Sequence, residues 1–318
     1  MRQPMNSGSS SSSPQLYGAI EAGGTKFVCA AGYDALSPLE GLRESIPTST
    51  PGETLAAVAG FFERVRREVG PLAGIGVAAF GPIDIDRASS SWGCLLETPK
   101  AGWSRASLIA PLERFGCPIA VDTDVNAAAL AEARFGAGAD VDSLAYVTVG
   151  TGIGGGVVID GRTLKGIPHP EMGHIRVRRD ESDVSFGGVC PFHGDCLEGL
   201  ASGPAVRARW HAAVETWPDD HVGFEIVGGY LGQLAATIAL MISCRRIVFG
   251  GGVMADGRML RHIRRATRAS LNGYLPIEAR AGGFDRFITA PALGPRAGVT
   301  GAMILAREAP PQTGSSRL

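Results

Sequence analysis

The stretch Leu16–Asp34, LYGAIEAGGTKFVCAAGYD, predicts a strand, a glycine turn and a second strand rich in Phe27, Val28 and Cys29. The stretch Ser143–Leu164, SLAYVTVGTGIGGGVVIDGRTL, repeats this plan, and its Asp-Gly pair predicts a further hairpin turn. Two strand–glycine–strand units this far apart in one chain indicate a duplicated architecture.

Helices and short strands alternate between and after these two units. The segments, in chain order, are a helix at 53–70, a strand running into a helix at 118–136, a long apolar helix at 224–244, a strand at 246–252, a basic amphipathic helix at 257–275, a strand at 286–293 and a helix at 297–308. Strands that alternate with helices, with hairpins interspersed, are typical of the α/β class.

The composition limits the partners. The 318 residues are 45% hydrophobic and 19% charged, enough for one large or two ordinary domains. The net charge of −1 gives no reason to expect a nucleic acid, and no apolar run approaches the length of a bilayer span. Residues 1–15 form a serine-rich tract that we expect to be a disordered tail. The sparse cysteines suit a reducing cytoplasm.

Three glycine clusters could hold phosphate groups. Gly150, Gly152 and Gly155 match the dinucleotide pattern G-x-G-x-x-G, but a β-branched strand follows them, so a Rossmann loop is excluded. A glycine turn between strands can still cradle phosphate through backbone N–H groups, or it can be only a tight hairpin. With EAGGTK at 21–26 and IVFGGGV at 247–253, the three together favour a nucleoside triphosphate between two lobes.

Two aspartates mark the end of a strand in VDTDVNAAAL, residues 121–130. Phosphoryl transfer needs a carboxylate that accepts the proton of the attacking hydroxyl group, and Asp124 is the candidate for this role. The alternative for Asp124 is an ordinary helix N-cap. Asp122 is the next candidate for the base.

The loop CPFHGDC suggests a metal site. Cys190, His193 and Cys196 follow one another at three-residue spacing, as three ligands that lack a fourth. The alternative is free cysteines and a surface histidine in a glycine loop.

In order and spacing, the motifs EAGGTK, DTDVNAAALAE, GTGIGGG, HPEMGHI, CPFHGDCLEGLASGPA and FGGGV resemble those of the ROK family of sugar kinases and repressors. The resemblance extends from Leu16 to the last helix. Glu21, the ETPKAGW stretch at 97–103 and the histidine of the CPFHGDC loop are most similar to the bacterial ROK fructokinases.

The resemblance implies an actin-like, hexokinase-like fold, a duplicated ribonuclease H-like architecture with an interlobe cleft. It implies a small lobe at 16–123, joined by a C-terminal helix at about 298–318, and a large lobe at 124–297 with a zinc-binding insert at 174–196. The cleft would close on ATP, Mg²⁺ and a hexose, and the family habit is a homodimer.

The resemblance also assigns roles to residues. Asp124 falls on the catalytic base, and Asn126, Glu171, His174 and Glu198 fall on or near the sugar ligands. The residues expected at the nucleotide and its phosphates are Gly23, Gly24, Thr25, Lys26, Gly150, Thr151, Gly152, Gly250, Gly251 and Gly252. Glu21 would keep a carboxylate near the phosphates and Mg²⁺. We interpret His169 as a polar loop residue rather than a substrate contact.

The family also carries a zinc site, which supplies the missing ligand. His174 would join Cys190, His193 and Cys196 in a closed tetrahedral site, typical of structural Zn²⁺.

We therefore expect an ATP-dependent fructokinase that converts D-fructose to D-fructose 6-phosphate. A glucokinase or mannokinase of the same family is the alternative, and a sugar sensor that does not bind DNA is a further one. A ROK repressor needs a helix-turn-helix domain ahead of the first glycine turn, where only the serine-rich tract stands.

Overall fold

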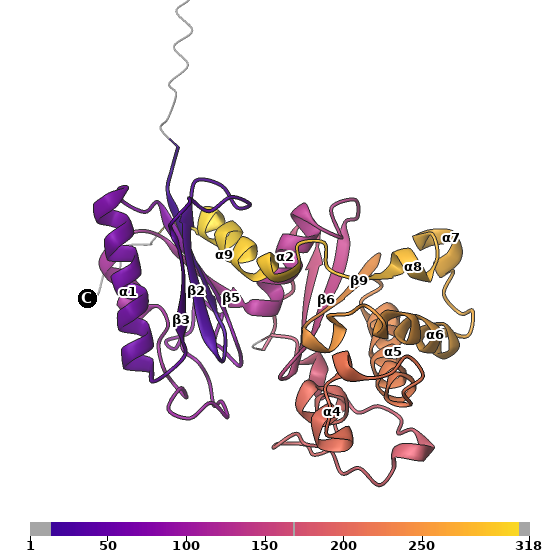
Figure 1. The fold of residues 1–318 in the computed structure, drawn as a ribbon. Helices are drawn as coiled ribbons and strands as arrows, with labels where there is room; N and C mark the ends of the chain where they lie inside the picture. The colour runs from indigo at the N-terminus through magenta and orange to yellow at the C-terminus, as the bar shows by residue number, and fades with distance from the viewer. Residues whose placement is uncertain (1–13, 168, 312–318) are drawn as a thin grey trace, which may run out of the picture.

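Two five-stranded sheets with helices between them and on their outer sides make up the fold (Figure 1). This computed structural model describes residues 14–167 and 169–311. The tail predicted at 1–15 therefore lies outside the described residues, except for its last two positions.

The first sheet has the strand order β3-β2-β1-β4-β5. Its strands are β1 (Tyr17–Ala22), β2 (Lys26–Gly32), β3 (Arg43–Pro47), β4 (Gly74–Ala79) and β5 (Ile119–Thr123). The first three form an antiparallel meander, and β4 and β5 extend the sheet in parallel beside β1. The predicted glycine turn joins β1 to β2.

The second sheet repeats this connectivity with the order β10-β9-β6-β7-β8. Its strands are β6 (Ser143–Val149), β7 (Ile153–Ile159), β8 (Arg162–Thr163), β9 (Arg246–Gly250) and β10 (Ile288–Thr289). Again three strands form an antiparallel meander and two more lie parallel to the first. The predicted duplicated α/β architecture is confirmed.

Two helices form the layer between the sheets. The helix α2 (Asp124–Phe135) packs on β6 and β7, and α9 (Ala297–Glu308) packs on β1, β4 and β5 (Figure 1). The two helices also pack on each other, which requires a residue without a side chain at Gly301. A Cβ atom at this position would lie 2.0 Å from the carbonyl oxygen of Ala127.

The remaining helices cover the outer faces and the connections. They are α1 (Pro51–Glu68) on the first sheet, α5 (Gly223–Met241) and α6 (Met259–Leu271) on the second, and the short helices α3 (Leu197–Ala201), α4 (Gly203–Trp210), α7 (Ile277–Ala281) and α8 (Phe284–Phe287). Single 3₁₀ turns occur at 110–115, 172–174, 181–183, 214–216, 252–254 and 294–296.

The helix α5 corrects our statement that no apolar run approaches the length of a bilayer span. By length and composition alone it could cross a membrane, but 67% of its most apolar window is buried inside the protein. Phe224, Leu231 and Leu234 of this helix belong to the core behind the second sheet. We therefore interpret α5 as a core helix.

The C-terminal helix matches the apolar pattern at 297–308 and is shorter than the 298–318 that the family resemblance implies. It ends at Glu308 and not at 318, because Pro310 and Pro311 follow and the residue before a proline disfavours helical backbone. Near its end, the Arg307 guanidinium lies 5.7 Å from the centroid of the Tyr17 ring at the start of β1. The helix thus belongs with the first sheet. The lobe boundaries at 123 and 297 stay a prediction.

The long irregular segment between β8 and α3 is fastened by a buried aspartate. Asp183 is 4% exposed, accepts a hydrogen bond from the Tyr230 hydroxyl group at 2.7 Å and lies 2.9 Å from Nε of Arg209. The guanidinium of Arg209 stacks on the ring of Phe186 at 4.1 Å. These contacts hold the predicted metal-binding insert against α4 and α5.

Candidate active site

Two cavities meet at Asp124. The larger one, of about 750 Å³, is lined by Gly24, 80–82, 97–100, 123–125, Thr148, 150–155, 169–171, His174, 189–193, Glu198, Ser202 and Pro204. The smaller one, of about 680 Å³, is lined by Glu21, Asp124, Val125, Ala128, Tyr146, Thr148, 249–252, 254–257, 290–291, 294–295 and 297–298. Among the described residues, Asp124, Val125 and Thr148 are the ones that line both.

The end of β5 and the start of α2 place Asp124. The cap of α2 is Thr123, whose hydroxyl oxygen accepts the N–H of Asn126 at 3.1 Å. Asp124 is therefore the first helical residue, and the alternative that it is only the N-cap is wrong. Its carboxylate accepts the N–H of Val125 at 2.8 Å and faces the junction of the cavities.

The surroundings of Asp124 suit a proton acceptor. Burial raises the pKa of this carboxyl group to about 7, the Val125 N–H opposes the shift, and the carboxylates of Glu21 and Glu171 add to it. A base with a pKa near the working pH combines a useful ionised fraction with real affinity for a proton. Asp124 is therefore poised to accept a proton at neutral pH.

Asp122 and Asn126, each two residues from Asp124 in the sequence, line neither cavity. Asn126 is fully buried, and its Nδ2 donates to Asp122 at 2.7 Å. Asp122 also accepts hydrogen bonds from the hydroxyl group of Thr163 at 2.8 Å and from the N–H of Thr123 at 2.8 Å. The structure thus does not bring Asn126 to the place predicted for a substrate ligand, because the side chain is fully buried and lines neither cavity; its Nδ2 is held by Asp122, whereas its Oδ1 has no hydrogen-bond partner among the described residues.

Glu171, just before the 3₁₀ turn Met172–His174, and Glu198, in α3, both line the larger cavity. Burial, and then the neighbouring Glu198, raise the pKa of Glu171 to about 7. Glu198 accepts the N–H of Ile153 at 2.9 Å. His169 is 8% exposed, its Nδ1 lies 3.3 Å from Glu171, and its Nε2 accepts the N–H of Ile83 at 3.4 Å. His169 thus lies in a loop, as predicted, but it is buried in the wall of the larger cavity; that it does not contact the substrate stays a prediction.

The structure divides the residues predicted at the nucleotide. Gly250, Gly251 and Gly252 line the smaller cavity, whereas Gly24 and residues 150–152 line the larger one. Gly23 and Thr25, on either side of Gly24, and Lys26, the first residue of β2, line neither cavity. A role of these turns at the phosphates stays a prediction.

The smaller cavity has features of an anion site that needs a divalent cation. Its wall includes Ala297 and Gly298 in the first turn of α9, and a helix N-terminus carries a partial positive charge that favours anions. The charged side chains that line it in the described part of the chain are the carboxylates of Glu21, Asp124 and Asp256. Burial raises the pKa of Glu21 against the opposing charges of Arg43 and Lys26. Carboxylate oxygens are the ligands that Mg²⁺ prefers.

Sequence reasoning missed Lys100 as a lining residue. It is the one lysine or arginine that lines the larger cavity among the described residues, and its Nζ donates to the Thr48 carbonyl oxygen at 3.4 Å. Its position in ETPKAGW, a stretch already noted as similar to one family, was the available signal.

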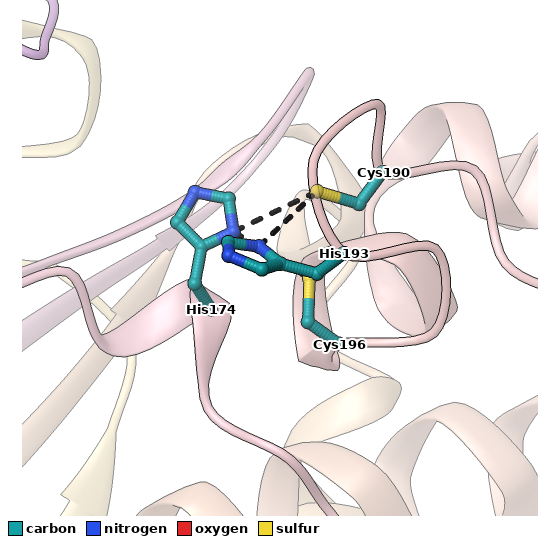
Figure 2. A group of neighbouring side chains, drawn as sticks. All are labelled: His174, Cys190, His193 and Cys196. Carbon is teal, nitrogen blue, oxygen red and sulfur yellow. Dashed lines mark hydrogen bonds between the residues drawn. The ribbon is translucent and has the colours of Figure 1, made fainter.

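His174, Cys190, His193 and Cys196 converge on one point (Figure 2). Their ligand atoms all lie within 4.8 Å of one another. The Nδ1 atom of His174 is 3.5 Å from the Cys196 sulfur and 3.8 Å from the Cys190 sulfur, and Nδ1 of His193 is 3.7 Å from the Cys190 sulfur.

This geometry fits zinc. Tetrahedral Zn–S bonds of about 2.3 Å and Zn–N bonds of about 2.0–2.1 Å place sulfur and nitrogen roughly 3.5–3.6 Å apart. The three nitrogen–sulfur separations given above lie close to this value, so the two cysteines and two histidines fit around one ion. The grouping of the four side chains favours a metal site over the alternative of free cysteines and a surface histidine, and the zinc itself stays a prediction.

Comparison with known proteins identifies the family. The ROK family model matches residues 17–309. A fructokinase from Zymomonas mobilis is 44% identical over 92% of this chain and 96% of its own, and a putative fructokinase from Bacillus subtilis is 40% identical with the same coverage. The structure of a ROK family glucokinase from Streptomyces griseus in complex with glucose and AMPPNP has a TM-score of 0.71 and 26% identity, covering 92% of this chain and 99% of that one. The chain belongs to the ROK family.

Proposed function

We propose that this protein is an ATP-dependent hexose kinase that converts D-fructose to D-fructose 6-phosphate. The observation that carries the proposal is that Asp124 lines both cavities at their junction. A hydroxyl group held in one cavity and a phosphate held in the other would meet beside this carboxylate. The names of the fructokinase relatives support fructose as the acceptor.

The larger cavity would hold the hexose. Glu171 and Glu198 offer carboxylate oxygens as acceptors for sugar hydroxyl groups, and Lys100 offers a donor. Nδ1 of His174 points to the sulfur atoms of Cys190 and Cys196 (Figure 2). Because His174 also lines the larger cavity, its Nε2 would donate a hydrogen bond to a sugar hydroxyl group there. These groups fix the acceptor hydroxyl and thereby reduce the entropic cost of bringing it to the phosphate.

Asp124 would accept the proton of the acceptor hydroxyl group. As the hydroxyl oxygen forms its bond to the terminal phosphorus, the bond from phosphorus to the bridging oxygen of ADP breaks. The electron pair of that broken bond leaves with ADP, and the proton moves to the Asp124 carboxylate. No covalent enzyme intermediate is needed, so positioning and one base suffice.

The smaller cavity would hold ATP, with residues 250–252 and the first turn of α9 around it. Because its charged lining is acidic, we propose that Mg²⁺ binds with the nucleotide and that Glu21 is the carboxylate of this chain that holds it. The ion supplies positive charge to the phosphate groups.

A structural Zn²⁺ would be held by His174, Cys190, His193 and Cys196. With four protein ligands the ion has no open position, so its role is to fix the loop and not to activate water. Glu171 lies three residues before one ligand and Glu198 two residues after another, so the ion holds both sugar-binding carboxylates in place.

The substrate can be tested directly. Purified protein with Mg²⁺ and ATP should show a higher kcat/KM for D-fructose than for D-mannose or D-glucose, because the cavity wall decides which sugar hydroxyl groups are paired. A clear preference for glucose or mannose would support the alternative kinases of the family. Hexose binding without turnover of any sugar would instead support the sugar sensor.

The pH dependence tests the role of Asp124. Its pKa of about 7 predicts that kcat/KM falls below pH 7, because a protonated carboxyl group cannot accept a proton, and reaches a plateau above it. The Glu171 carboxyl group titrates in the same range. The acid limb should therefore persist in Glu171→Gln and vanish from the residual rate of Asp124→Asn. A limb that persists in Asp124→Asn would assign it to another group.

We further propose that the enzyme works in the cytoplasm as a homodimer, with a small lobe at 16–123 completed by α9 and a large lobe at 124–297. The reducing cytoplasm suits the thiolate ligands of the metal group. Sedimentation of the purified protein measures the oligomeric state.

A further inference from the structure

Glu132 is a carboxylate buried in the last turn of α2, where a charge is costly. Its side chain is fully buried, and no lysine, arginine or histidine pairs with it in the part of the chain that the structure describes. It accepts three backbone N–H groups instead, from Ala137 at 2.7 Å, Ala292 at 3.0 Å and Leu293 at 2.8 Å. Burial of such a group without hydrogen-bond partners is strongly unfavourable, so these three bonds stabilise it in this place.

We propose that Glu132 is a positioning residue that holds the wall of the nucleotide cavity in register with the helix that carries Asp124. We call Glu132 and its three donors the Glu132 clamp. The proposal rests on the assignment of ATP to the smaller cavity.

The donors show what the clamp holds. Ala292 and Leu293 lie between β10 and α9, and their neighbours Ala290, Pro291, Gly294 and Pro295 line the smaller cavity. At the other end of the connection, Glu132 stands two turns along α2 from Asp124. The clamp thus joins the nucleotide wall to the catalytic helix through one side chain.

The clamp also lies where the chain passes between the sheets. Among the described residues, one passage leads from β5 through α2 to β6, and the other leads from β10 to α9 (Figure 1). The Glu132 carboxylate belongs to the first passage and accepts hydrogen bonds from the N–H groups of Ala292 and Leu293 in the second. A rotation of one sheet relative to the other therefore has to turn about this point or break its hydrogen bonds.

The chain leaves room for this arrangement at Gly136. A Cβ atom there would lie 2.1 Å from Oε2 of Glu132, the oxygen that accepts from both Ala137 and Ala292. A side chain at 136 would displace the carboxylate from its donors. The glycine is thus part of the clamp.

The test is Glu132→Gln. Three N–H donors face two carboxylate oxygens, so an amide must turn its own N–H₂ group toward at least one donor. KM for ATP should rise about tenfold, because a buried donor loses its charged acceptor, while KM for the hexose stays within about twofold. Glu308→Gln is the matched control, because Glu308 also links α9 to α2, through Arg134, but is exposed.

Unchanged KM values for both substrates in Glu132→Gln would overturn the clamp alone. A rise confined to KM for the hexose would overturn it together with the assignment of the two cavities. If the variant does not fold, hydrogen exchange of the wild-type chain decides. AMPPNP with Mg²⁺ should slow exchange at Ala292 and Leu293 more than the hexose alone does, and no slowing would contradict the proposal.

Discussion

Replacement of Asp124 with asparagine should lower kcat by on the order of a hundredfold or more. The amide cannot accept a proton at neutral pH, so the acceptor hydroxyl group loses its base. The amide oxygen can still accept the N–H of Val125, so the start of α2 should keep its shape. Steady-state rates with hexose and ATP measure the effect.

The same variant should retain its fold, its zinc content and its binding of the hexose. A matched control is Asp160→Asn, because Asp160 lies exposed in the hairpin turn after β7, with a positive φ that asparagine also adopts. Turnover close to wild type in a folded Asp124→Asn protein would show that another group is the base. Asp122 would then be the next candidate, although it lines neither cavity.

Loss of the zinc site should be nearly as damaging, and chiefly to hexose binding. Protein purified without a chelator should carry one Zn²⁺ per chain, and Cys196→Ser should lose it. Metal affinity is part of the folding free energy of such a loop, so its geometry at Glu171 and Glu198 should relax. KM for the hexose should rise by about ten- to a hundredfold, the range seen when support around a metal site is removed, while KM for ATP changes little.

Cys94→Ser is the control for this experiment, because Cys94 is half-buried and lies outside the metal group. It should keep both the ion and the activity. His174→Ala is less informative, since this side chain also lines the hexose cavity. Metal analysis that finds fully active protein without zinc would rule out the structural role.

Local patterns in the sequence predicted features whose partners are near in the chain. The two hairpins follow from apolar strands around glycine turns, and three of the four side chains in the proposed metal group follow from the spacing within Cys190–Cys196. His174 lies sixteen residues before this loop, so spacing could not supply it and the family resemblance did. In the same way, the sequence could not show whether Thr123 or Asp124 caps α2, because threonine and aspartate both favour the N-cap position.

Features that depend on distant contacts could not be predicted. Glu132 has the pattern of an ordinary helical glutamate, and two of its donors lie 160 and 161 residues away. The location of His169 beside Ile83 likewise depends on how two remote loops meet. The division of the glycine turns between two cavities follows from the arrangement of the sheets, which periodicity does not encode.

The contact of Arg307 with Tyr17 brings the two ends of the described fold together. The last helix, α9, packs on the first sheet, where the described chain begins. The chain therefore runs from the first sheet through the second and back to the first. The two halves are therefore not separable as fragments, because the first half is split between the two ends of the sequence. We therefore expect the architecture to depend on which segments pack together and not on the positions of the chain termini.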